Sequence, residues 1–166
     1  MSKLFPDLHV PSVWEIDFDK LYADGIRGII LDIDNTLAPY FVPDPDKKIE
    51  DGIQKLQEKS FSLFIVSNGR EERVIRFNRS LNLPYYCKAS KPTAKGFKVA
   101  QQHMGLKPEQ IAVIGDQIFT DVWGGNRLNM KTVLVKQVSP KDEWITKVKR
   151  PLEKIVMFFY RRKKRV

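Results

Sequence analysis

Two aspartates, Asp32 and Asp34, directly follow the apolar run Gly28–Leu31 in the stretch GIILDIDNTLAPY. Side chains at positions i and i+2 of a strand point to the same face, so we expect the two carboxylates to lie close together. Like charges at that spacing repel, and either a proton or a cation must neutralise them. Oxygen ligands with no histidine or cysteine nearby suit Mg²⁺.

The elements that position these residues follow from hydrophobic periodicity. Strands are expected at residues 28–33, 61–67, 85–87, 111–116 and 131–135. Helices are expected at residues 46–60, 71–81, 93–104 and 120–128, after a short helix or turn-rich lead-in at 12–23. This alternation predicts an α/β, Rossmann-like fold with a mostly parallel central sheet and helices on both faces.

Polar residues end each of the three strongest strands. Asp32 and Asp34 end the first, Ser67 and Asn68 end the second, and Asp116 ends the third. Open α/β sheets bind ligands outside the carboxyl ends of their strands. The three strand ends are therefore expected to form one site.

Four segments resemble the motifs of the haloacid-dehalogenase-like (HAD) phosphatases and occur in the order found in that family. They are Asp32–Thr36 (DIDNT), Ser67–Asn68, Lys91–Pro92, and Gly115–Asp116 with Asp121 in GDQIFTD. Each lies on its expected element, and together they cover most of the domain. The resemblance implies a capless HAD fold and a phosphoric monoester hydrolase.

The same resemblance implies a role for each residue. Asp32 is the nucleophile that forms an aspartyl-phosphate, and Asp34 protonates the leaving oxygen and later deprotonates the attacking water. Dehalogenase relatives lack this second acid. Lys91 supplies positive charge to the phosphate and to Asp32. Ser67 and the backbone N–H of Asn68 are expected to bind the phosphoryl oxygens.

The resemblance also implies a Mg²⁺ site. Its expected ligands are Asp32, the backbone carbonyl of Asp34, and Asp116, with water molecules completing the shell. Asp121 is expected to help through an outer or water-mediated contact, and Thr36 to brace the loop after the nucleophile.

Plainer interpretations exist for single residues. Asp116 or Asp121 alone is typical of a helix cap, and Ser67-Asn68-Gly69 is typical of a turn. Lys88 competes with Lys91, which is preferred because a proline follows it, as in the relatives. The joint occurrence of all these residues favours the active-site interpretation.

Two arginines are further candidates for binding the substrate. Arg70 follows Ser67-Asn68-Gly69, and Arg127 ends the stretch GGNR. Arginines near the site would grip a second phosphate or an acidic group of the substrate. The alternative is a salt bridge across helix ends.

The spacing after Asp34 and after Ser67 leaves no room for a large cap domain, which predicts a member of subclass IIIA. An open site suits a macromolecular or membrane-presented substrate. The stretches GIRGIILDIDNTL, SNGREERV and GDQIFTDVWGGNR resemble the YqeG-like branch. Relatives of that branch include phosphatidylglycerophosphate phosphatases, so this lipid is the expected substrate.

Basic residues gather at the C-terminus, where residues 141–166 carry +7 of the net charge of +9. We therefore divide the chain into a phosphatase domain, 1–140, and a basic C-terminal helix and tail, 141–166. Pro151 is expected to start the helix. Five basic residues, Arg161–Arg165, follow an apolar face formed by Leu152, Ile155, Val156 and Phe159.

This C-terminal segment has three interpretations. A basic amphipathic helix is typical of peripheral contact with an anionic membrane. A core-packed last helix with a solvated tail is the second interpretation. Binding of nucleic acid is the third, and it would make the chain a 3′-phosphatase or an RNA- or ribosome-binding module. The third is less favoured because the body contains no basic groove or nucleic-acid motif.

Composition excludes several classes of protein. The single cysteine, Cys87, allows no intramolecular disulfide and no cysteine-based zinc site. The first ten residues do not resemble a signal peptide, and no apolar stretch approaches the roughly 20 residues that span a bilayer. We expect a cytoplasmic protein, with peripheral contact at the inner face of the membrane if the tail binds lipid.

Overall fold

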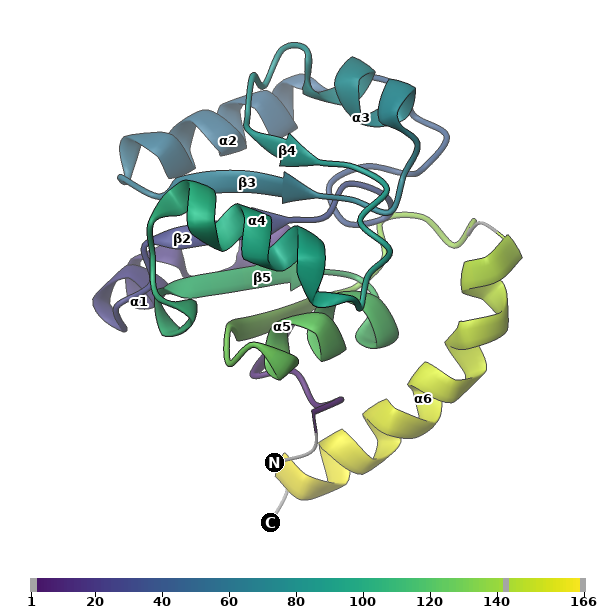
Figure 1. The fold of residues 1–166 in the computed structure, drawn as a ribbon. Helices are drawn as coiled ribbons and strands as arrows, with labels where there is room; N and C mark the ends of the chain where they lie inside the picture. The colour runs from purple at the N-terminus through teal and green to yellow at the C-terminus, as the bar shows by residue number, and fades with distance from the viewer. Residues whose placement is uncertain (1–2, 142–143, 165–166) are drawn as a thin grey trace.

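A parallel sheet forms the centre of the molecule. The computed structural model describes residues 3–141 and 144–164, and within them six strands pair in the order β1-β6-β5-β2-β3-β4 (Figure 1). Every pairing between neighbouring strands of this sheet is parallel. The strands are β1 (Leu8–Val10), β2 (Gly28–Leu31), β3 (Ser62–Val66), β4 (Tyr85–Tyr86), β5 (Ile111–Gly115) and β6 (Lys131–Val135). The expected α/β fold is confirmed.

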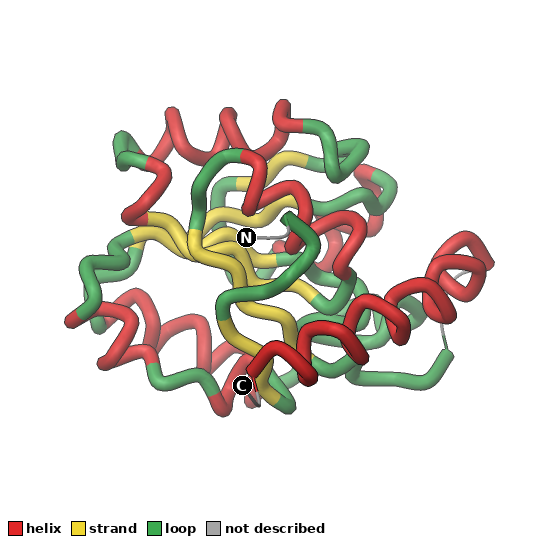
Figure 2. Tube along the Cα trace, turned by 90° about the horizontal axis from the view of Figure 1, so that it is seen from below, coloured by secondary structure: helices red, strands yellow, loops and turns green. Residues whose placement is uncertain are grey.

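Helices cover both faces of the sheet (Figure 2). They are α1 (Phe18–Ala23), α2 (Lys47–Glu58), α3 (Glu71–Asn78), α4 (Ala94–Met104), α5 (Trp123–Arg127) and α6 (Trp144–Lys164). Short 3₁₀ turns occupy Val13–Glu15 and Pro108–Gln110, and a π-helical turn, η3, occupies Ile118–Val122. Among the described segments, those after β2 and β3 are loops and short helices without a domain of their own, as expected of a capless fold.

Alternation along the strands builds two core layers. Ile29 and Leu31 of β2 pack in one cluster with buried residues of α1, α2 and α3. Ile30, between them, packs in a second cluster with Phe97 and Ala100 of α4. A strand that is buried on both faces must be apolar throughout, which is why β2 contains no polar residue before Asp32.

The edge strand β1 was not expected from the sequence. It has only three residues, Leu8–Val10, and prolines stand close on both sides. Its parallel pairing with β6, from Leu8 opposite Val133 to Val10 opposite Val135, forms this strand. A segment of three residues is too short for hydrophobic periodicity to predict a strand.

Helix α6 differs from the expectation in two ways. It begins at Trp144, so Pro151 lies inside the helix and does not start it. Val156 lies on the inner side, partly buried against Ile118, Val122 and Leu134, so it does not belong to an outer apolar face. Arg165, the last of the five consecutive basic residues, lies outside the described residues.

The inner side of α6 also contains the buried residues Glu153 and Tyr160, whereas Leu152, Ile155 and Phe159 are exposed. Figure 1 shows the helix running past the side of the body toward which the strands point. None of the helices in the described part of the chain combines the length and the hydropathy needed to cross a membrane.

Candidate active site

The site lies where three neighbouring strands end. Strands β5, β2 and β3 are adjacent, and Asp116, Asp32 and Ser67 follow them directly. One carboxylate oxygen each from Asp32, Asp116 and Asp121 lie within 4.8 Å of one another, and all three residues are buried. The topology thus brings together the acids that the sequence placed at separate strand ends.

Lys91 lies between two of these acids. Its Nζ is 2.7 Å from Asp32 Oδ1 and 2.6 Å from Asp121 Oδ1, and all three side chains are less than a tenth exposed. The competing residue Lys88 is exposed and pairs with Glu71 at 3.7 Å. The geometry therefore selects Lys91 over Lys88 as the lysine of the site.

Asn68 holds the backbone of Lys91. Its Oδ1 accepts the Lys91 N–H at 2.7 Å, and its Nδ2 donates to the Lys91 carbonyl at 3.4 Å. The Ser67 hydroxyl accepts the Gly69 N–H at 3.0 Å. The amide of Asn68 is thus used to position the lysine.

Gly115 makes room for Asp121. A Cβ at Gly115 would lie 2.2 Å from the carboxyl carbon of Asp121, closer than any side chain tolerates. The Gln117 N–H and the Thr120 hydroxyl donate to Asp121 Oδ2 at 3.3 and 3.1 Å. The π-helical turn η3 therefore returns Asp121 over the end of β5 toward Lys91.

Thr36 lies between two of the acids. Its hydroxyl is 3.4 Å from Asp32 Oδ2 and 3.3 Å from Asp116 Oδ1. These contacts agree with the expected bracing role.

Asp34 pairs with Arg73, a residue that sequence reasoning missed. Arg73 Nη2 lies 3.2 Å from Asp34 Oδ1, and the guanidinium also donates to the carbonyls of Pro39 and Pro43. Arg73 of helix α3 therefore holds both Asp34 and the loop that contains Pro39 and Pro43. The sequence contained one indication of this contact. Arg73 lies in the first turn of the helix expected after the strand at 61–67, and this turn begins close to the expected site.

A hypothetical Cβ at Gly69 would lie 3.1 Å from Ser67 Oγ and 3.2 Å from Asp34 Oδ2. The Ser67 hydroxyl and the Asp34 carboxylate thus border the same small space.

The structure does not bring Arg127 to this site. It ends α5, with its guanidinium 5.8 Å from the Trp123 ring centroid. Its neighbour Asn126 donates to the carbonyls of Lys3 and Phe5, beside the amino end of β1. Arg127 thus lies near the amino ends of the strands, whereas Asp32 lies at their carboxyl ends. Arg70 is exposed at the N-cap of α3, on the side of the sheet where the strands have their carboxyl ends.

A second arginine missed by sequence reasoning comes from α6. Arg150 Nη2 lies 2.5 Å from Asp116 Oδ2, and Nη1 donates to the Asp116 carbonyl at 3.0 Å. No local pattern predicts this contact, because 34 residues separate the two partners.

Comparison with known proteins decides the family. A family model described as HAD-hydrolase-like matches residues 88–157. The protein named "Probable phosphatase YqeG" of Bacillus subtilis (strain 168) is 38% identical over 98% of this chain and 95% of its own length.

The chain belongs to the HAD-like phosphatases.

The YqeG relative and a second, more distant relative place this HAD phosphatase in the YqeG and phosphatidylglycerophosphate phosphatase branch, and a solved structure shares its fold. The chloroplastic phosphatidylglycerophosphate phosphatase 1 of Chlamydomonas reinhardtii is 26% identical over 86% of this chain, which spans 56% of that protein's length. A HAD-like family hydrolase of Porphyromonas gingivalis shares the fold, with a TM-score of 0.58 at 17% identity over 77% of this chain and 98% of that one.

The acidic cluster of this HAD phosphatase suits a divalent cation. Its donors are carboxylate oxygens, the ligands that Mg²⁺ and Ca²⁺ prefer. Burial raises the pKa of Asp32 well above its usual range, and the charges of Asp121 and Asp116 raise it further, against the opposing effect of Lys91. Burial also raises the pKa of Asp116 to about 7, although Arg150 opposes this shift. A cation would relieve these repulsions.

Lys91 shows the complementary shift. Burial alone would lower its pKa, but the carboxylates of Asp121 and Asp32 outweigh burial and raise it. The lysine of this HAD phosphatase is therefore charged throughout the physiological range.

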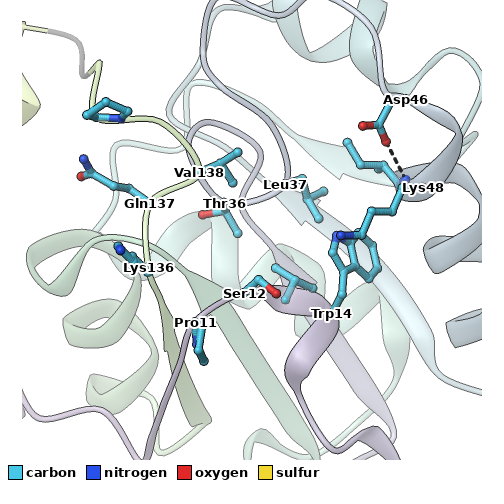
Figure 3. A pocket seen from close by; sticks show the side chains of 13 residues that line it. Pro11, Ser12, Trp14, Thr36, Leu37, Asp46, Lys48, Lys136, Gln137 and Val138 are labelled. Atoms are coloured by element: carbon cyan, nitrogen blue, oxygen red, sulfur yellow. Dashed lines mark hydrogen bonds between the residues drawn. The ribbon is translucent and has the colours of Figure 1, made fainter.

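One cavity lies beside Thr36, and a second one borders the acidic cluster at Asp116. The first, of about 550 Å³, lies beside Thr36 and Leu37, between the segments that follow β1 and β6 and the start of α2 (Figure 3). Asp46 caps that helix by accepting the Ile49 N–H at 2.9 Å. The other, of about 460 Å³, lies between α6 and the body, and Asp116 and Arg150 line it.

The raised pKa of Asp116 predicts how the binding of a divalent cation to the acidic cluster would depend on pH. In the folded chain this acid keeps its proton up to about pH 7, whereas the unfolded chain loses it near pH 4, so its ionisation lowers stability as pH rises through that interval. A divalent cation held by Asp116 would bind the ionised carboxylate, so its affinity should fall about tenfold per pH unit below 7. Thermal unfolding with and without Mg²⁺ should therefore show a larger stabilisation at pH 8 than at pH 6. Equal stabilisation at both pH values would contradict this prediction.

Proposed function

We propose that this HAD phosphatase hydrolyses phosphomonoesters with Mg²⁺ through an aspartyl-phosphate on Asp32. The observation that carries the proposal is the grouping of Asp32, Asp116 and Asp121 around the buried Lys91 at the carboxyl edge. Asp32, Asp116 and the backbone carbonyl of Asp34 would hold the cation, with Asp121 in an outer contact. Bound Mg²⁺ would supply charge neutralisation for the carboxylates and for the phosphoryl group.

The first step is attack by the Asp32 carboxylate on phosphorus. The bond between phosphorus and the leaving oxygen breaks, and Asp34 gives that oxygen its proton. In the second step Asp34 takes a proton from water, the water oxygen bonds to phosphorus, and Asp32 leaves as a carboxylate with release of inorganic phosphate. Arg73, 3.2 Å from Asp34, orients this acid.

The remaining residues of the site serve the transferred group. Lys91 stabilises the negative charge of the phosphoryl oxygens. Ser67 already accepts a hydrogen bond from Gly69, and its hydroxyl proton is directed to a phosphoryl oxygen together with the backbone N–H of Asn68. Arg70, exposed at the same edge, suits a contact with a more distant anionic group of the substrate.

We further propose that the substrate is a lipid-linked phosphomonoester, phosphatidylglycerophosphate, at the surface of an anionic membrane. Support comes from the named activity of the algal relative and from the outer face of α6. This outer face consists of four apolar side chains that are each more than half exposed, namely Leu152, Ile155, Phe158 and Phe159. The exposed basic residues Arg161, Arg162 and Lys163 adjoin it. Basic residues near an anionic bilayer contribute about 1 kcal/mol each.

In this proposal residues 141–166 form the membrane-contacting appendage of a catalytic domain that comprises residues 1–140. The division at residue 140 stays a prediction.

Phosphate release from a panel of compounds tests the function. The panel comprises phosphatidylglycerophosphate in anionic vesicles, a soluble sugar phosphate, a nucleotide and a 3′-phosphorylated oligonucleotide, each with Mg²⁺ and with chelator. We expect Mg²⁺-dependent release with a strong preference for the lipid. Preference for the oligonucleotide would favour the nucleic-acid alternative, and release that persists in chelator would overturn the metal-dependent mechanism.

Vesicle binding tests the role of the outer face separately. The double variant Phe158→Ser, Phe159→Ser should lose co-sedimentation with vesicles that contain anionic lipid. Ile75→Ser is the matched control, because Ile75 is a comparably exposed apolar residue on α3. Unchanged binding by the double variant would rule out these two aromatic residues as the main membrane contact.

A further inference from the structure

We propose that Arg150, held by Glu153, positions Asp116 for the divalent cation, so that the C-terminal helix completes the metal site of the body. This inference rests on the proposed metal-dependent function. It concerns two residues that lie beyond the four motifs of the family and beyond the expected boundary at residue 140.

Arg150 contacts both the side chain and the backbone of Asp116. Nη2 lies 2.5 Å from Asp116 Oδ2, and Nη1 donates to the Asp116 backbone carbonyl at 3.0 Å. A guanidinium that holds both the side chain and the main chain of one aspartate leaves its carboxylate little rotational freedom. The Asp116 side chain has no exposed surface, and the Arg150 side chain is 19% exposed.

Glu153 fixes Arg150 in turn. One of its carboxylate oxygens accepts Arg150 Nη1 at 2.9 Å, and the other accepts the Ile118 N–H at 2.7 Å. Ile118 begins the π-helical turn that contains Asp121. The two residues of α6 therefore tie the helix to the segment that contains both Asp116 and Asp121.

The two oxygens of Asp116 have different surroundings. Oδ2 receives Arg150, whereas Oδ1 lies 3.3 Å from the Thr36 hydroxyl, which is itself 3.4 Å from Asp32 Oδ2. Arg150 thus holds Oδ2 of Asp116 and leaves Oδ1 directed toward Thr36 and Asp32. Partners of this kind orient metal ligands, and their loss typically costs about 10- to 100-fold in metal affinity.

The test measures Mn²⁺ binding to the full chain from the electron paramagnetic resonance signal of free Mn²⁺. Arg150→Gln should weaken Mn²⁺ binding about 10- to 100-fold. Arg150→Lys keeps the positive charge but cannot contact the Asp116 carboxylate and carbonyl with two separate nitrogens. It should therefore cause a smaller loss of Mn²⁺ affinity. Lys154→Gln is the control, because it removes one positive charge from an exposed position of the same helix.

Thermal unfolding in chelator accompanies each titration. A purely structural role for Arg150 predicts a lower melting temperature with unchanged Mn²⁺ affinity, and that result would overturn the inference. If Arg150→Gln fails to fold, native affinity in the folded Arg150→Lys variant would likewise overturn it. A native chain that binds Mn²⁺ but releases no phosphate would sink the proposed function alone, whereas a native chain that binds no Mn²⁺ would sink both.

Discussion

Asp32→Asn is expected to abolish phosphate release while leaving the fold intact. The amide has nearly the shape of the carboxylate but cannot attack phosphorus, and loss of a nucleophile costs on the order of 10⁵–10⁶ in turnover. Because burial raises the pKa of Asp32, its charged form is costly in the fold, and a neutral amide is tolerated. Lys91 keeps its second partner, Asp121, at 2.6 Å. Phosphate release and thermal unfolding should be measured on the same preparations.

The control for this experiment is Asp44→Asn, which removes an exposed carboxylate that pairs with Arg76 at 2.9 Å. It should keep native turnover. Acid quench during turnover should trap a phosphorylated native chain, and the adduct should be missing from Asp32→Asn. Turnover within a hundredfold of native in Asp32→Asn, or an adduct on that variant, would show that another group attacks phosphorus.

Lys91→Met is expected to lower both stability and activity. Lys91 is the shared partner of two buried carboxylates, Asp32 and Asp121. Its loss leaves these two carboxylates without their positively charged partner. Breaking a buried pair by removing one partner costs about 3–5 kcal/mol. Urea unfolding in chelator should show a loss of that size. Mg²⁺ should restore more stability to this variant than to the native chain, because the cation would then balance the buried carboxylate charge that Lys91 no longer balances.

Lys88→Met is the matched control. Lys88 is exposed, and its pair with Glu71 at 3.7 Å is a surface ion pair worth about 0–1 kcal/mol. Equal losses of stability in the two methionine variants would contradict the assignment of Lys91 as the buried lysine of the site.

Much of the site was predictable because a parallel sheet collects its strand ends on one edge. The apolar runs before Asp32, Ser67 and Asp116 are long enough to predict strands without any tertiary information. The structure makes these three strands neighbours, which is why the residues after them meet. Lys91 was identified among two lysines only by the proline after it, and its burial between two carboxylates agrees with that choice.

The separation of Arg127 from the acidic cluster has a geometric reason. A helix that follows a parallel strand runs back along the sheet, so its last residue lies at the amino edge. Asp121, at the start of that helical segment, reaches the site, whereas Arg127, at its end, lies near the amino end of β1. Closeness in sequence to a site residue was a poor guide here, because the direction of the helix decides the distance.

The sequence by itself determined the alternation of strands and helices from β2 to β6, the family, and the places of Asp32, Asp34 and Asp116 after their strands. Such features are local, since each depends on an apolar run and the polar residue that ends it. Tertiary structure alone decided the pairing of Arg73 with Asp34, the pairing of Arg150 with Asp116, and the three-residue strand β1. Each of these joins segments that lie far apart in the chain, and an exposed arginine and a buried one have the same local sequence signal. Their partners are chosen by the packing of α3 and α6 against the body, which no pattern of neighbouring residues encodes.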